Sequence, residues 1–174
     1  ITPTGQSLRH TTVDSLATID LAGGARNGNK ASKEFPFHLA AYAAAPAARA
    51  IVHLHSPDVM PYTVTKIPLK PMIHMAGFLP QQIPMFEIRK TGGMTDMLIR
   101  TNELGKALAE TLGSQPVALL RGHGAVVVAD SLHVVAGRSY YMTVNARTET
   151  QALMLSGGKV TFLAPEEASK AAAQ

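Results

Sequence analysis

Two histidines lie two positions apart at the end of an apolar run, in the segment AIVHLHSP (residues 50–57). Side chains at positions i and i+2 of a β-strand project from the same face, so a strand here would aim His53 and His55 the same way. Two adjacent imidazoles can chelate one metal ion, and functional groups of α/β sheets gather at the carboxyl ends of strands. The alternative is a structural pair whose ring nitrogens are hydrogen-bonded inside the fold.

A third histidine, His123, stands between two glycines in LLRGHGAVVV (residues 119–128). The glycines would let the backbone turn sharply and come close to another group. Three neutral imidazoles that leave coordination positions open are the ligand pattern of catalytic zinc, and other divalent metals also use it. The three histidines therefore predict a divalent-metal site. Four further histidines are interpreted as structural or exposed: His10, His38, His74 and His133.

A carboxylate, Glu34, lies in NGNKASKEFPFH (residues 27–38), where a helix is expected to begin. The helix dipole favours an anion in the first turn, which is a structural reason for an acidic residue there. The functional interpretation places Glu34 facing the metal as a general acid/base.

Donors of hydrogen bonds surround this carboxylate in the sequence. Free backbone N–H groups at a helix start form an anion site, and a hydroxyl and an ammonium group stand beside them. The segment ITPTG offers similar donors near the amino end. We therefore expect a substrate carboxylate or phosphate to bind between two loops, at Thr4, Gly5, Ser32 and Lys33.

The elements that must position these residues alternate between strand and helix, which predicts one α/β domain. Strands are expected in the segments 15–24, 48–55 and 83–88, and a strand, tight turn and strand in 116–130. Helices are expected over 32–45, 101–113 and 131–158, with Ser32 and Ser131 as N-caps and Gly113 and Gly157 near the C-terminal ends, and a short helix or turn is expected over 57–65. The tail 159–174 is expected to cross to a neighbouring subunit or stay loose.

The composition limits the class of protein. Of 174 residues, 46% are apolar and 16% charged, which is typical of a globular chain, and the absence of cysteine excludes disulfides and thiolate metal sites. The net charge of +4 comes from scattered Lys and Arg, which disfavours nucleic-acid binding. It suits a small anionic molecule, and the alternative is an ordinary solvated surface with a small excess of positive charge.

No apolar run is long enough for a membrane span, because Pro46 and Arg49 interrupt the longest one. The start ITPTGQS lacks the features of a signal peptide. These observations predict a cytoplasmic protein without membrane association. The absence of an initial Met also indicates that an upstream segment is missing.

Four motifs in this order, TPTG, SKE, AIVHLHSP and LLRGHGAVVV, resemble the class II aldolase/adducin family over nearly the whole chain. The resemblance implies a single domain over residues 1–174 that lacks its N-terminal segment. It also implies a three-layer α/β/α fold with a mostly antiparallel central sheet, and a homotetramer with sites at subunit interfaces. It assigns one divalent metal, Zn²⁺ or Mn²⁺ with Co²⁺ as a further candidate, to His53, His55 and His123. Glu34 matches the catalytic acid/base, and Thr4, Gly5 and Ser32 match residues that contact the anionic group of the substrate.

Some residues depart from the sugar-phosphate aldolases of the family. Lys33 resembles the decarboxylating branches, and the segments GGMTDMLIR and RGHG look closer to decarboxylases of hydroxylated aromatic or pyridine carboxylic acids. The family's upstream Gly-Asn-x-Ser motif is absent, so one wall of the substrate site cannot be read.

The expected function is therefore a metal-dependent C–C lyase that decarboxylates a hydroxylated aromatic or related carboxylic acid through a metal-stabilised enolate. Two alternatives remain: an aldolase for a sugar phosphate or a hydroxy-oxo-acid, and a non-catalytic, adducin-like interaction module.

Overall fold

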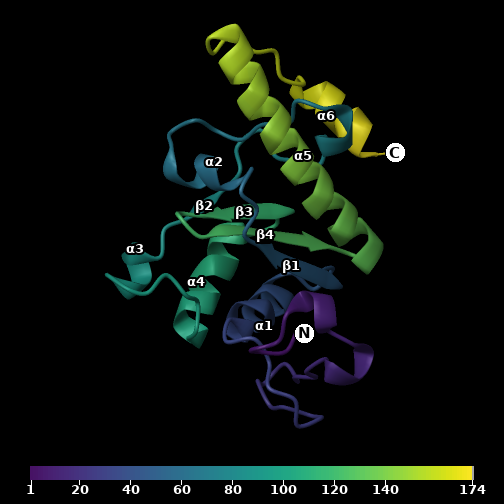
Figure 1. Cartoon of the computed structure of the whole chain (residues 1–174), viewed down its shortest axis with the longest axis vertical. Coiled ribbons are helices and arrows are strands. Elements are labelled where there is room, and N and C mark those ends of the chain that lie inside the picture. The colour runs from purple at the N-terminus through teal and green to yellow at the C-terminus, as the bar shows by residue number, and fades with distance from the viewer. Residues whose placement is uncertain (174) are drawn as a thin grey trace. The chain divides into compact units, whose positions relative to one another are not determined.

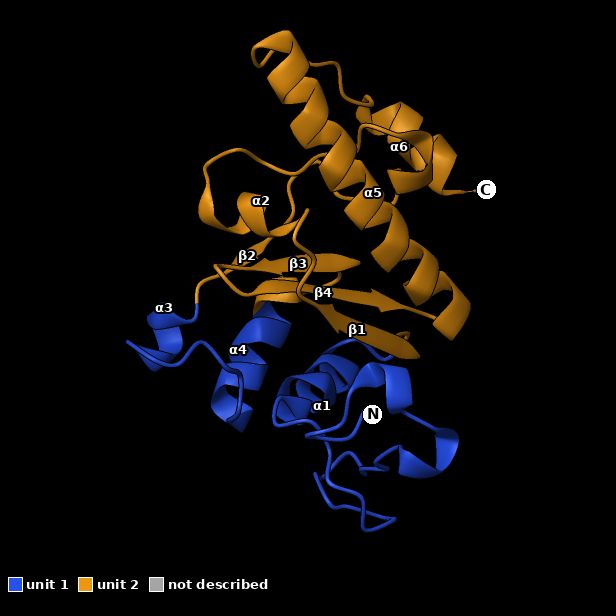
Figure 2. Ribbon diagram, viewed as in Figure 1, with its two compact units in different colours: residues 1–46, 88–110 blue, residues 47–87, 111–174 orange. Residues whose placement is uncertain are grey.

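The computed structural model describes residues 1–173 (Figure 1). The chain forms two compact units (Figure 2). Unit 1 comprises Ile1–Pro46 and Ile88–Glu110, and unit 2 comprises Ala47–Glu87 and the described residues from Thr111 onward. No helix among the described residues has both the length and the hydropathy needed to cross a bilayer.

Unit 2 is built on a four-stranded sheet with the order β1-β4-β3-β2. Strand β1 pairs antiparallel with β4, and β4 pairs antiparallel with β3, whereas the short β2 pairs parallel with β3. The sheet is therefore mixed, with two of its three pairings antiparallel, and the α/β class predicted from the sequence is confirmed. The strands are β1 (Ala50–Leu54), β2 (Met85–Phe86), β3 (Val117–Leu120) and β4 (Gly124–Ala129).

The long helix α5 (Leu132–Ser156) packs against β1 and β4 (Figure 1). Its start is capped by Ser131, whose Oγ accepts a hydrogen bond from Val134 N at 3.3 Å, and its end by Gly157 at φ +61°. Every residue of β3 and β4 is buried, and the apolar cluster between sheet and helix includes Val127 and Met142. Burial of such side chains contributes about 25 cal/mol per Å² of apolar surface, so this cluster stabilises the packing of α5 on the sheet.

Two polar residues on α5 hold the backbone of an irregular segment that crosses the helix. Asn145 Oδ1 accepts hydrogen bonds from Met72 N and Ile73 N, and its Nδ2 donates to Lys70 O. One turn later, Glu149 Oε2 accepts from Lys70 N at 3.0 Å. Both side chains are fully buried, because the irregular segment has no strand partner for its backbone groups and α5 supplies the partners instead.

The C-terminal segment packs against its own chain, so the expectation of a loose tail is wrong for the described residues, whereas a contact of this segment with a neighbouring subunit stays a prediction. Helix α6 (Pro165–Ala172) packs against the short helix η3 (His74–Ala76). A Cβ at Gly77 would lie 2.5 Å from Ala168 O, so the glycine allows this close approach of the two backbones. The predicted short helix in 57–65 is α2 (Met60–Val64).

Unit 1 contains α1 (Phe35–Ala44), most of α4 (Asn102–Leu112) and the short helices η1 (Leu8–His10), η2 (Val13–Ser15) and α3 (Arg89–Gly92). A Cβ at Gly105 of α4 would lie 2.8 Å from Pro36 O of α1, so a glycine is required where these helices meet. Gly113 follows α4 with φ +54°, as the sequence predicts.

The strand predicted over 15–24 does not form. This segment makes only an isolated bridge between Ile19 and Ala25. Asp20 explains the difference, because its Oδ1 accepts hydrogen bonds from Ala22 N at 3.0 Å and Gly24 N at 2.7 Å. An aspartate that bonds the backbone two residues on favours a turn over an extended strand.

Candidate metal centre

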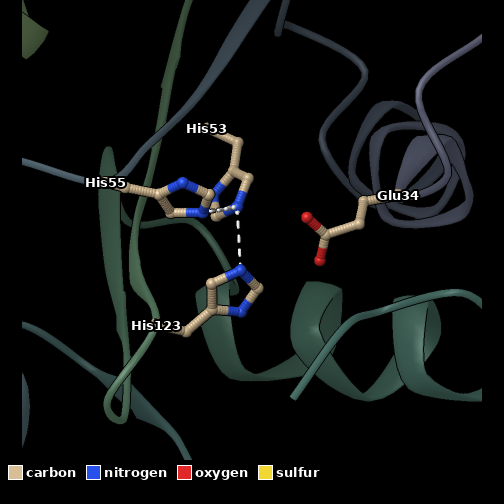
Figure 3. Close-up of side chains that lie close together, drawn as sticks. All are labelled: Glu34, His53, His55 and His123. Carbon is tan, nitrogen blue, oxygen red and sulfur yellow. Dashed lines mark hydrogen bonds between the residues drawn. The ribbon is translucent and has the colours of Figure 1, made fainter. Parts of the chain in front are cut away.

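Unit 2 brings the three predicted histidines together (Figure 3). His53 lies on β1 opposite Val126 of β4, and His55 follows the last residue of β1. His123 lies in the turn that joins β3 to β4. Since Leu54 pairs with Ala125, the antiparallel register places the end of β1 beside this turn.

The imidazole nitrogens converge at one point. His53 Nε2 lies 3.0 Å from His55 Nε2 and 3.3 Å from His123 Nε2. The candidate ligand atoms of the three residues all lie within 4.8 Å of one another. The prediction that these three side chains share one site is therefore supported by their geometry.

The tautomer of His53 favours metal binding. Its Nδ1 lies 3.0 Å from Ala125 O, and a carbonyl oxygen can only accept, so Nδ1 carries the proton and Nε2 of the neutral ring presents a lone pair. A backbone carbonyl that fixes the second nitrogen is typical of histidines that bind metals. Nitrogens placed tetrahedrally at the usual zinc distance stand about 3.3 Å apart, close to the spacing found here. The residues present thus fit a divalent ion.

Gly124 permits the close approach of the turn to the strand end. Its φ is +153°, and a Cβ there would overlap the Leu54 carbonyl oxygen and lie 3.0 Å from His55 Cδ2. Gly122 has φ +61°, in the left-handed region that glycine adopts without strain. Both glycines of the RGHG motif are therefore needed for the placement of His123.

The site is accessible to a ligand. His55 is exposed, and His53 and His123 are half-buried. An ion held by these rings would keep positions open to a substrate, as catalytic sites require.

Glu34 belongs to unit 1, where the structure fixes one of its oxygens. The side chain is only 9% exposed, and Oε1 accepts a hydrogen bond from Ile99 N at 2.9 Å. Glu34 is itself the N-cap residue of α1, but its side chain makes no capping hydrogen bond. A capping role therefore does not account for this buried carboxylate.

Ser32 is not the N-cap of α1, because the helix begins later than predicted, at Phe35. Ser32 N donates to Thr2 O at 3.0 Å and Ser32 O accepts from Phe35 N at 3.1 Å, so both of these N–H groups are engaged. The predicted helix-start amides are thus not available as a set of anion donors. The hydroxyl of Ser32 and the exposed ammonium of Lys33 remain candidate donors.

The two loops predicted to bind an anion lie side by side in unit 1. An antiparallel bridge joins Pro3 to Ala31, and Thr4 N donates to Lys30 O at 2.9 Å. The Thr4 amide is therefore also engaged, and Thr4 could contribute through its hydroxyl. Gly5 lies next to it with φ +73° and is exposed.

One functional group escaped the sequence analysis, the carbonyl oxygen of Ala125. It orients His53, but its identity depends on strand register and not on residue type. No pattern in the sequence indicates it.

Comparison with known proteins confirms the family. The sequence model of the family described as Class II Aldolase and Adducin N-terminal domain matches residues 1–150. The chain is similar to the decarboxylase tropJ of Talaromyces stipitatus, with 35% identity over 68% of this chain and 49% of that protein. It is also similar to the 3,4-dihydroxyphthalate decarboxylase of Rhodococcus jostii, with 33% identity over 66% of this chain and 46% of that protein.

A solved structure supports the same assignment. The crystal structure of YgbL from Klebsiella pneumoniae matches with a TM-score of 0.76 and 25% identity, over 97% of this chain and 79% of that one. The chain belongs to the class II aldolase and adducin N-terminal domain family, and it has the fold of that family. It spans about half the length of the two curated relatives named above.

Proposed function

We propose that the protein is a divalent-metal-dependent C–C lyase, and specifically a decarboxylase of a hydroxylated aromatic or related carboxylic acid. The observation that carries the proposal is the convergence of three histidine nitrogens at 3.0 and 3.3 Å. The decarboxylase names of the two curated relatives support the choice of reaction.

His53, His55 and His123 would hold one ion, with Zn²⁺ and Mn²⁺ as the first candidates and Co²⁺ as a third. When bound, a divalent ion supplies a Lewis acid that stabilises negative charge developing on a substrate oxygen. All three proposed ligands are nitrogens, which suits zinc and other transition metals better than magnesium or calcium.

Glu34 would act as the general acid that donates a proton to the substrate. When carbon dioxide leaves, the electron pair of the broken C–C bond remains with the substrate, and the carbon takes up a proton in place of the carboxylate. A carboxyl group can donate that proton. The hydrogen bond from Ile99 N to Oε1 fixes the orientation of the Glu34 side chain, which proton transfer requires.

The substrate carboxylate would be bound by the two joined loops of unit 1. The hydroxyls of Thr4 and Ser32, the backbone of Gly5 and the ammonium of Lys33 are the groups proposed for this role. A homotetramer in the cytoplasm is proposed on the resemblance to the family alone, and light scattering of the purified protein would test the assembly.

Metal removal and product analysis test the function. We expect treatment with a chelator to abolish the decarboxylase activity on dihydroxylated aromatic acids, and addition of Zn²⁺, Mn²⁺ or Co²⁺ to restore it. The restored reaction should release carbon dioxide and form no aldehyde. Aldehyde formation from a sugar phosphate would instead support an aldolase. Full activity in metal-free protein would contradict the metal-dependent mechanism, and absence of both metal and activity would favour an adducin-like interaction module.

A further inference from the structure

Three backbone N–H groups of the turn that carries His123 donate hydrogen bonds to acceptors on three different elements. Arg121 N donates to Phe86 O of β2 at 3.0 Å, and His123 N donates to Leu120 O of β3 at 3.0 Å. Between them, Gly122 N donates to the side-chain oxygen Thr63 Oγ1 of α2 at 3.1 Å. Thr63 thus supplies a side-chain contact that a substitution can remove without altering the backbone of the turn.

Thr63 is well placed to accept this bond. Its side chain is buried, with the residue only 2% exposed, and its hydroxyl proton is directed to Met60 O at 2.8 Å within α2. Because the proton is committed there, a lone pair of Oγ1 faces the Gly122 N–H. Gly122 is half-buried, so without this acceptor its N–H would have to bond solvent instead of the fold.

Helix α2 is also tied to the other two histidines. The chain leaves β1 at His55, and the next carbonyl, Ser56 O, accepts hydrogen bonds from Val59 N at 3.1 Å and Met60 N at 3.0 Å. The segment that follows His55 therefore leads directly into α2. Through α2, the hydroxyl of Thr63 connects the end of the strand that bears His53 and His55 to the turn that bears His123.

We propose that Thr63 is a positioning residue for the metal centre, which holds the His123 turn at the distance at which the three imidazoles share one ion. This inference rests on the proposed metal-binding function. Thr63 is not one of the proposed ligands: it acts through Gly122, which has no Cβ and therefore more backbone freedom than other residues, so the hydrogen bond to Thr63 restricts its conformation. Groups that orient ligands in this indirect way typically change metal affinity by 10- to 100-fold when they are removed.

The test compares three variants of the full chain, with Co²⁺ as the probe. Thr63→Val replaces the hydroxyl by a methyl group, Thr63→Ser keeps the hydroxyl, and Thr143→Val is the matched control. Thr143 is a half-buried threonine on α5, and its hydroxyl donates to Ser139 O within its own helix, away from the His123 turn. Affinity for Co²⁺ is measured by competition with a chelator, and exchange of the Gly122 amide proton is followed by NMR in the metal-free proteins.

We expect Thr63→Val to bind Co²⁺ roughly 10- to 100-fold more weakly and to exchange the Gly122 proton faster. Thr63→Ser and Thr143→Val should bind Co²⁺ with an affinity within about threefold of the wild-type value. A change of about threefold is smaller than the roughly 10- to 100-fold loss expected when a positioning group is removed. Thr63→Ala, which also lacks the hydroxyl, replaces the valine variant where the latter does not fold.

Two results would overturn the inference alone: wild-type affinity in Thr63→Val, or an equal loss in Thr63→Ser. Failure of the wild-type chain to bind Co²⁺ would overturn the proposed function and this inference with it. The two failures are therefore distinguishable in one experiment.

Discussion

His53 is the residue on which the site depends most, because its Nε2 contacts both other rings and its Nδ1 is fixed by Ala125 O. The sequence predicted the three histidines because residue type and spacing carry that information. It could not predict the Ala125 carbonyl or the Thr63 hydroxyl, because each meets its partner through contacts between segments about 60 to 70 residues apart.

Gly124 leads to a prediction at the scale of single residues. Replacing Gly124 by Ala places a methyl group on the Leu54 carbonyl and against the His55 ring. We expect a loss of 2 kcal/mol or more in the free energy of unfolding, as for other clashes at strained backbone positions, together with weaker metal binding. Urea denaturation and chelator competition measure the two effects.

Gly137 provides the matched control, because it lies within α5 and, apart from its chain neighbours and the nearby backbone of the helix itself, no described atom lies within 4 Å of the position of an added Cβ. Gly137→Ala is expected to stabilise the protein by about 0.5–1 kcal/mol, since alanine has the higher helix propensity. Equal effects of the two substitutions would contradict the steric argument.

At the scale of elements, the buried Glu149 makes α5 sensitive to pH. Burial raises the pKa of Glu149 from 4.5 to about 7, although the hydrogen bond from Lys70 N and the charge of Lys70 act in the opposite direction. Between about pH 4.5 and about pH 7, the Glu149 carboxyl is therefore protonated in the folded state and ionised in the unfolded chain. The contribution of Glu149 to stability is fully present below about pH 4.5 and is lost as the pH rises to about 7.

Glu149→Gln tests this dependence, since glutamine keeps an oxygen for Lys70 N but does not ionise. Relative to this variant, the wild-type protein should lose on the order of 3 kcal/mol of unfolding free energy between pH 4.5 and 7. Above pH 7 the variant should be the more stable of the two proteins in chemical denaturation.

The control substitution is Glu166→Gln on α6, whose side chain is exposed and which should show no such difference. A wild-type protein that remained more stable than Glu149→Gln at pH 8 would contradict the raised pKa.

The prediction of elements from sequence succeeded where apolar periodicity and terminal residues agreed, as in α5 between Ser131 and Gly157. It failed at residues 15–24, where alternating apolar residues indicate a strand but Asp20 bonds the local backbone. The expectation of a loose tail was also wrong, because α6 packs against η3, about 90 residues earlier in the chain. Local sequence patterns do not indicate contacts between segments so far apart in the chain.

At the scale of the whole molecule, a bound metal ion should raise the thermal stability of the folded chain. A ligand that binds only the folded state stabilises it by about 4 kcal/mol at a concentration of 1,000 times Kd. We therefore expect saturating Zn²⁺ to raise the melting temperature of the wild-type chain and to have little effect on His53→Ala. Differential scanning calorimetry measures the shift.

His133→Ala is the control for this experiment, because His133 is exposed at the start of α5 and is not one of the proposed ligands. It should respond to Zn²⁺ as the wild-type chain does. A shift of equal size in His53→Ala would indicate that the ion binds elsewhere.

The pairing of β1 with β4 has a further consequence for affinity. His53 and His123 are 70 positions apart, and closing a loop of that length in a flexible chain costs about 4 kcal/mol of entropy. This entropy is lost when β1 pairs with β4 during folding, and not when an ion binds. By this reasoning the folded chain presents its proposed ligands at an effective concentration roughly a thousandfold above that in an unfolded chain. The affinity of the proposed site for a metal would then depend on the sheet as much as on the imidazoles.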